Sequence, residues 1–195
     1  MTFLRNTLFA FCGGLLLAGA TAAAEPIPGD SVYQLAAGFT DQDGRDFRLV
    51  ERTGKPQVVA LFYTSCRYVC PLIIDSAKAV EHALDPAQRD RVAFLIVSMD
   101  PARDDPAALR GIVDKRGLDT KRWTLARTDK GAVRQLASLL DVRYRELADG
   151  EFNHTSALVL LDAQGRRIAR TERLGGTADT EFVEAVKAAL DSARN

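Results

Sequence analysis

Apolar residues in this chain form runs whose spacing alternates between that of strands and that of helices. Residues 57–63 and 91–99 are dominated by β-branched, aromatic and other apolar side chains, which predicts strands buried on both faces. An Asp-Gly pair between two alternating stretches predicts a β-hairpin over residues 39–49. Shorter strands are predicted over residues 123–126, 157–161 and 167–172, and helices from about residue 70 and over residues 106–116, 130–140 and 180–192.

These elements alternate along the chain and end with a second hairpin and a terminal helix. That order predicts an α/β fold with a mixed central β-sheet flanked by helices and an N-terminal β-hairpin. Residues 25–37 carry two prolines and little pattern, so we expect an extended lead-in followed by one domain over residues 38–195. Two cysteines, Cys66 and Cys70, lie where the first buried strand turns into a helix. Because that arrangement is typical of thioredoxin-like proteins, we predict a thioredoxin-like fold.

The first 24 residues differ from the rest. Arg5 is the only charged side chain before Glu25, and an apolar stretch leads from it to a run of three alanines, Ala22 to Ala24. These are the parts of a secretory signal peptide. The alternative is a retained anchor in the inner membrane. Both readings predict an exported, periplasmic protein whose membrane contact is limited to residues 1–24.

Composition and charge narrow the classes of function. The chain has 195 residues, with 26 Lys and Arg balanced by 26 Asp and Glu. Phosphate binding needs an excess of basic side chains on one face, so no nucleic-acid partner is expected. A domain of this length can bury a core without metal or disulfide staples. A metal ion would therefore serve function rather than folding.

The two cysteines carry the candidate chemistry. In an oxidising compartment, Cys66 and Cys70 can form a disulfide, a redox couple or a metal site. Pro71 is tolerated only in the first turn of a helix, which therefore begins near Cys70. The unpaired N–H groups and the dipole at a helix N-terminus favour thiolate and lower a cysteine's pKa. Spacing alone does not choose among the three fates.

Histidine narrows the choice. His82 follows Cys70 by twelve residues of predicted helix, roughly 18 Å along the axis, so we expect a solvated helix residue. His154 precedes the strand at residues 157–161. In a thioredoxin-like domain that loop lies against the dithiol, and redox thioredoxins place a cis-proline there, whereas the last proline here is Pro106. The alternative for His154 is a loop histidine bonded to backbone.

Two thiolates and one imidazole form a soft donor set. It suits copper, above all Cu(I), with Zn(II) as the main competitor. An imidazole offered where a proline is expected indicates metal coordination rather than pure disulfide exchange. The sequence thus favours a copper site built from Cys66, Cys70 and His154.

Three motifs resemble those of the Sco/SenC family. They are Phe62-Tyr63-Thr64-Ser65-Cys66-x-x-Val69-Cys70-Pro71, Val97-Ser98-Met99-Asp100-Pro101-x-Arg103-Asp104, and Phe152-Asn153-His154-Thr155-Ser156 followed by Leu161-Asp162-x-x-Gly165. The resemblance runs from about Phe39 to the C-terminus. Members of this family are thioredoxin-like, copper-binding assembly factors for the binuclear copper centre of cytochrome c oxidase.

The resemblance implies a role and a ligand set. It implies a periplasmic copper metallochaperone in which Cys66, Cys70 and His154 bind one ion, Cu(I) or Cu(II). The ion is delivered to the copper-receiving subunit of cytochrome c oxidase, with a thiol reductant or an upstream copper donor as further partners. It also implies that Asp100 lies near the site and that Arg103 and Asp104 pair to fix its loop. The alternative is that this segment only sets turns.

An enzymatic function stays open beside the chaperone. Cys66 and Cys70 can act as the redox pair of a thiol-disulfide oxidoreductase that reduces the cysteines of the oxidase copper site. Members most like the mitochondrial proteins have Pro-Asp between the cysteines and Asp before the histidine, where this chain has Arg67, Tyr68 and Asn153. The change makes the surroundings more positive, which favours thiolate but repels a cation. A peroxide-reducing enzyme is least favoured, because nothing singles out a peroxidatic cysteine.

Overall fold

The computed structural model describes residues 26–66 and 69–193. In that part of the chain a seven-stranded mixed sheet has the order β2-β1-β5-β4-β3-β8-β9. Strands β3, β4 and β5 are parallel, whereas β8 runs antiparallel to β3 and β1 runs antiparallel to β5. The strands are β1 (Gly38–Asp41), β2 (Asp46–Arg48), β3 (Gln57–Phe62), β4 (Ala93–Ser98), β5 (Trp123–Arg127), β8 (Leu158–Leu161) and β9 (Arg167–Thr171).

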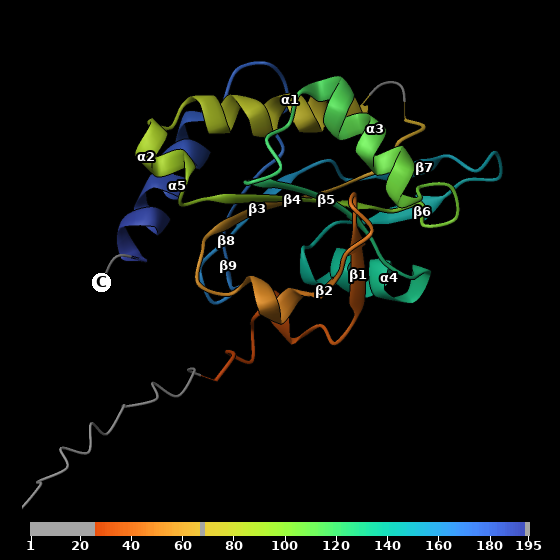
Figure 1. Ribbon diagram of the computed structural model, residues 1–195, viewed down its shortest axis with the longest axis horizontal. Helices are drawn as coiled ribbons and strands as arrows, with labels where there is room; N and C mark the ends of the chain where they lie inside the picture. Colours follow the sequence, from red (N-terminus) through yellow and green to blue (C-terminus); the bar gives the residue numbers. More distant parts are fainter. Residues whose placement is uncertain (1–25, 67–68, 194–195) are drawn as a thin grey trace, which may run out of the picture.

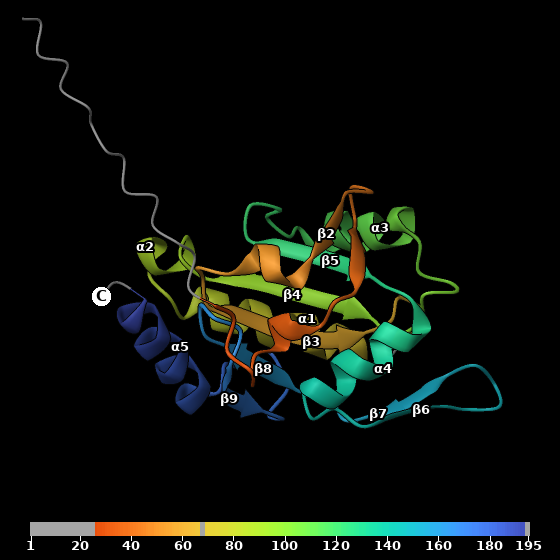
Figure 2. The same cartoon turned by 90° about the horizontal axis from the view of Figure 1, so that it is seen from below.

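Helices cover both faces of the sheet (Figures 1 and 2). Helices α1 and α3 lie on one face and α4 lies on the opposite face, while α5 packs beside β9. The helices are α1 (Val69–His82), α2 (Pro86–Arg89), α3 (Pro106–Arg116), α4 (Lys130–Leu139) and α5 (Thr180–Ser192), with 3₁₀ turns η1 (Val32–Gln34) and η2 (Leu49–Arg52). No helix in the described part of the chain is long and apolar enough to cross a membrane.

Local sequence explains where several elements begin and end. Every residue of β3 is buried, as expected for a central strand with apolar side chains on both faces. Helix α3 begins after Asp105, whose carboxylate accepts from the N–H of Ala108 at 2.8 Å. It ends at Gly117, which takes the left-handed conformation. Asp129 and Asp179 cap α4 and α5 in the same way.

The predicted fold class is confirmed. The structure has the mixed central sheet, the flanking helices and the N-terminal hairpin of a thioredoxin-like α/β fold. Helices α3 and α5 have the predicted bounds. Residues 1–25 lie outside the described residues, and with them the predicted signal peptide or anchor and Glu25.

The expected extended lead-in differs from the structure. It contains η1, in which Val32 and Tyr33 are buried. The N–H of Val32 donates to the carbonyl of Gly165 at 2.9 Å in the turn between β8 and β9. This segment packs on the core because a glycine at residue 165 leaves room for it: a Cβ there would lie 2.5 Å from the Tyr33 ring.

The hairpin between residues 144 and 154 was not predicted. Strands β6 (Tyr144–Glu146) and β7 (Phe152–His154) form a separate two-stranded sheet. We expected His154 in a loop, but it is the last residue of β7. The sequence did not indicate these strands because each has three residues and neither is buried. Helix α2 was also missed, since it is a single capped turn with no buried residue.

Candidate metal centre

Cys66 and Cys70 lie where β3 leads into α1, as predicted. Cys66 is half-buried, Cys70 is buried, and both are thiols in this structure. The backbone N–H of Cys70 points at the sulfur of Cys66 at 3.4 Å, and the N–H of Tyr63 points at the sulfur of Cys70 at 3.4 Å. Two backbone donors thus face the two sulfurs, which is the electrostatic environment that stabilises a thiolate or a thiolate-metal bond.

Burial changes the expected acidity of the second cysteine. It raises the pKa of the Cys70 thiol well above its ordinary range, and the nearby Cys66 and Asp104 add to the effect. The N–H of Tyr63 lowers this pKa, but by less than burial raises it. The prediction of a lowered pKa is therefore wrong for Cys70. Binding of a metal ion at this sulfur must displace a proton.

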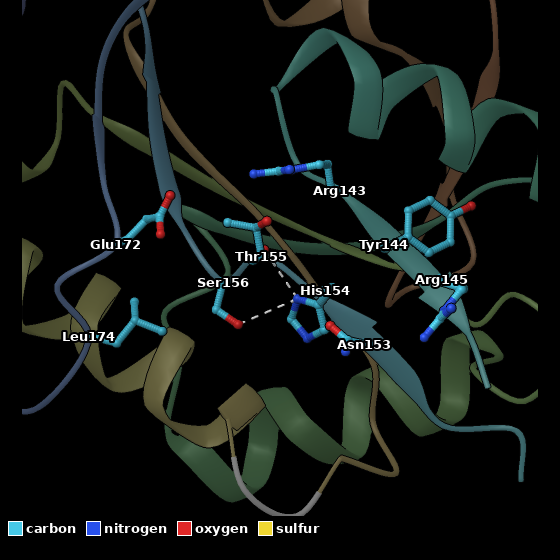
Figure 3. Close-up of a pocket in the computed structure, with 9 residues that line it drawn as sticks. All are labelled: Arg143, Tyr144, Arg145, Asn153, His154, Thr155, Ser156, Glu172 and Leu174. Atoms are coloured by element: carbon cyan, nitrogen blue, oxygen red, sulfur yellow. Dashed lines mark hydrogen bonds between the residues drawn. The ribbon is translucent and has the colours of Figure 1, made fainter.

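His154 ends the β6–β7 hairpin and faces a cavity of about 770 Å³ (Figure 3). Its Nδ1 atom lies 3.2 Å from the carbonyl oxygen of Thr155 and 3.4 Å from Oγ of Ser156. Burial lowers the pKa of His154, which the contact with Thr155 partly offsets. Burial therefore favours the neutral ring, the form in which imidazole binds metal. In this conformation His154 makes the backbone contact of the alternative interpretation.

Tyr63 connects the dithiol to the hairpin. Its ring meets the His154 ring edge-on, with centroids 6.2 Å apart, and the Phe152 ring at 5.1 Å. Its hydroxyl donates to Oε2 of Glu151 at 2.8 Å. Burial, followed by hydrogen bonding to Glu151 and Cys66, raises the pKa of Tyr63 far above its ordinary range. One residue therefore adjoins all the predicted ligands, through its side chain for Cys66 and His154 and through its backbone N–H for Cys70.

The predicted ligands are neighbours but do not form a closed metal site. Among the residues that the structure describes, no group of three His, Cys, Asp or Glu side chains is close enough to hold a metal ion. Cys66 and Cys70 line a small cavity of about 90 Å³ that includes Tyr63 and Pro71, whereas His154 lines the larger one. Coordination by all three ligands requires the His154 ring to move towards the sulfurs.

Asp104 supports the loop that leads to Cys66. Its fully buried carboxylate accepts from the N–H of Thr64 at 3.0 Å, from the Thr64 hydroxyl and from Oγ of Ser98 at 2.5 Å. The implied Arg103–Asp104 pair is wrong, since Arg103 pairs with Asp100. The reason is that the Asp104 carboxylate turns inward to Thr64 and Ser98, while Arg103 stays largely exposed.

Arg103 also reaches the β6–β7 hairpin. Its guanidinium donates to the carbonyl of Gly150 in the turn between β6 and β7. The loop after β4 is therefore tied to the element that carries His154. Sequence analysis missed the roles of Tyr63 and Glu151, because a tyrosine at a strand end and a glutamate in a polar loop carry no distinguishing signal. His82 is the exposed last residue of α1, as predicted.

Comparison with known proteins identifies the family of this chain. The SCO1/SenC family model matches residues 31–191. The chain belongs to the SCO1/SenC family. The resemblance stated from the sequence is thereby confirmed. No curated protein matches the chain in a sequence comparison.

Solved structures of several other proteins share the fold. A proposed electron transfer protein from Aquifex aeolicus VF5 is 25% identical, with a TM-score of 0.68, over 84% of this chain and 91% of its own. Bradyrhizobium japonicum ScoI with copper bound is 23% identical, with a TM-score of 0.63, over 80% and 96%. BsSco, described as a member of the Sco family of cytochrome c oxidase assembly proteins with a disulfide switch, is 19% identical, with a TM-score of 0.66, over 78% and 90%.

Proposed function

We propose that this SCO1/SenC protein is a periplasmic copper metallochaperone. It binds one copper ion through Cys66, Cys70 and His154 and delivers it to the copper-receiving subunit of cytochrome c oxidase. The observation that carries the proposal is that all three residues neighbour Tyr63, although His154 is more than 80 residues from the two cysteines along the chain. The copper-bound relative and the oxidase-assembly relative support the choice of metal and of client.

The donor set fits the cargo. Two thiolates and a neutral imidazole suit Cu(I), with Zn(II) as the main competitor. The strand pairing of the β6–β7 hairpin is confined to its own two strands, and contacts from Tyr63 and Arg103 tie it to the rest of the domain. Capture then requires His154 to leave the carbonyl of Thr155 and turn its ring past Tyr63.

Release proceeds by ligand exchange with cysteines of the recipient. The redox state of the dithiol controls affinity, because closing the disulfide takes two electrons and two protons from Cys66 and Cys70, which an oxidant accepts. That reaction removes both sulfur ligands at once. A thiol reductant that restores the pair and an upstream copper donor complete the expected set of partners.

Copper titration of the reduced and the oxidised protein tests the proposal. The reduced protein should bind one equivalent, and the oxidised protein far less. Cys66→Ser or Cys70→Ser should abolish binding, and His154→Ala should weaken it strongly. The matched control is His82→Ala, which removes the other histidine of the chain and should leave the titration unchanged. Wild-type copper affinity in His154→Ala would show that His154 is not a copper ligand.

A thiol-disulfide oxidoreductase is the second candidate. It is favoured by the half-buried Cys66, whose sulfur accepts a hydrogen bond from the backbone N–H of Cys70 at the start of α1. Against it, no peptide bond over residues 26–66 and 69–193 is cis, whereas redox thioredoxins carry a cis-proline beside the dithiol. An insulin-reduction assay run beside the titration separates the two functions. Strong insulin reduction without copper binding would assign the protein as an oxidoreductase and not as a copper chaperone.

The proposed location follows from the N-terminal segment. We expect residues 1–24 to direct export to the periplasm, as a cleaved signal peptide or as an anchor in the inner membrane. Cell fractionation and the intact mass of the exported protein distinguish the two. Recovery of the full-length chain in the cytoplasm would contradict export.

A further inference from the structure

Three arginines without carboxylate partners surround the hairpin that carries His154. Arg143 and Arg145 line the cavity that His154 faces (Figure 3). Arg134 lies with Arg143 and Tyr144 along an adjoining cavity of about 380 Å³. Within the described chain none of these three makes an ion pair, whereas most other arginines of the domain do so, as Arg103, Arg110, Arg116, Arg122, Arg166, Arg170 and Arg173 each show.

Two of the acidic side chains nearby are already paired, whereas Asp141, which lines the smaller cavity with Arg134 and Arg143, makes no ion pair in the described structure. Glu172, the carboxylate that lines the larger cavity, is 2.5 Å from Arg170. Glu146, which follows Arg145 in β6, is 2.6 Å from Lys130. The three guanidinium groups outnumber the one carboxylate beside them, so the cluster of Arg134, Arg143 and Arg145 keeps a net positive charge, although the whole chain has a formal net charge of zero. Exposed like charges so close together favour an anionic partner.

The position of this cluster indicates what covers it. A protein that takes copper from His154 must bring a donor atom within bonding distance of the same ion, so its surface must cover the area around that ring. On the hairpin side that area is formed by Arg143 and Arg145 and by polar groups of Asn153 and Ser156. Arg145 lies opposite Asn153 in the strand pairing, directly before His154.

We propose that Arg134, Arg143 and Arg145 form a docking surface for an acidic face of the copper recipient. This inference rests on the proposed function, because the occupant is the protein that receives the ion. Charge complementarity of this kind speeds encounter and sets the orientation of the partners. A small, wet and salt-sensitive contact suits a transfer complex that must separate after each delivery.

The test uses metal-free protein, so that docking is measured apart from copper binding. The partner is the purified copper-receiving domain of the oxidase subunit from the same organism. Association rates are measured by surface plasmon resonance at about 20 mM and about 200 mM salt, which brackets the range where screening becomes strong. The test variant carries Arg143→Glu and Arg145→Glu. The matched control is Arg167→Glu, which alters an arginine of β9 that lines neither cavity and has no ion pair in the described structure.

The wild-type rate should fall as salt rises. The double variant should associate at least about tenfold more slowly at low salt and lose most of the salt dependence, while the control stays within about twofold of wild type. Equal rates for the double variant and the control would overturn the proposal, as would absence of binding by the wild-type protein. Copper titration of the same proteins without the partner shows separately whether the metal site fails.

Anionic vesicles of phosphatidylglycerol provide the competing outcome. The proposal predicts that the double variant and Arg167→Glu bind vesicles equally. Preferential loss of vesicle binding in the double variant, without loss of binding to the recipient, would assign the cluster to a lipid surface and overturn the docking proposal.

Discussion

The hydroxyl of Tyr63 donates to Oε2 of Glu151 at 2.8 Å and so joins the end of β3 to the β6–β7 hairpin. The same residue directs its backbone N–H at the sulfur of Cys70. Together with the contact from Arg103 to Gly150, this bond holds the hairpin against the body of the domain. The place of His154 relative to the dithiol therefore depends on a tyrosine that binds no metal.

Tyr63→Phe keeps the ring and removes the tie to Glu151. We expect copper affinity to fall several-fold and the thiolate-to-copper absorption bands to shift. The free energy of unfolding should fall by about 1 kcal/mol, because one hydrogen bond is lost. Titration and spectra of the copper-loaded variant measure the effect. Tyr33→Phe is the control, because it removes a buried hydroxyl that accepts a hydrogen bond from Nε2 of Gln57 far from the site. If both variants bind copper like wild type, Tyr63 does not position the site.

Asp104→Asn should destabilise the fold. An amide of the same shape cannot accept from all three donors of Thr64 and Ser98 and leaves a buried polar group unsatisfied, at a cost of about 2–4 kcal/mol. Urea unfolding measures the loss. Asp105→Asn is the control at the neighbouring position, where asparagine caps α3 as well as aspartate does. Equal midpoints for the two variants would contradict the role given to Asp104.

Gly165→Ala should destabilise the fold both by a steric clash and by an unfavourable backbone conformation, and comparison with Gly44→Ala separates the two effects. Residue 165 has a φ of +83°, and its Cβ would meet Ser31 and the buried Tyr33 ring at 2.5 Å. Gly44 has a similar φ of +76° but open space around it. Gly44→Ala should therefore cost about 1–2 kcal/mol from the backbone alone, and Gly165→Ala clearly more. Equal shifts in melting temperature would show that η1 moves aside freely.

The raised pKa of Cys70, caused mainly by burial, predicts a pH dependence of stability. Folding favours the neutral thiol, so the native chain holds this proton more tightly than the unfolded chain does. The stabilising contribution is complete below the unfolded pKa of about 8.5 and is lost as pH rises above it. The free energy of unfolding of the reduced, metal-free protein is measured with denaturant between about pH 8 and pH 10. It should fall more steeply with pH for wild type than for Cys70→Ser. Parallel curves would contradict a buried, neutral thiol.

Local patterns predicted much of the fold. The Asp-Pro start and the glycine end of α3 delimit that helix, and the continuous apolar run of β3 marks a strand buried throughout. The same patterns missed β6 and β7, because short strands with exposed polar side chains have no periodic apolar face. The pairing of Arg103 was also wrong, since the direction in which a loop carboxylate turns depends on donors from another part of the chain.

By itself the sequence determined the fold class, the dithiol at the start of a helix and the family, because these follow from residue types at short, regular spacings. Only the tertiary structure decided that Tyr63 contacts both cysteines and His154, that burial raises the pKa of Cys70, and that arginines without ion pairs gather around the hairpin. These features depend on contacts between residues far apart along the chain, and hydrophobic periodicity does not encode which side chains meet there.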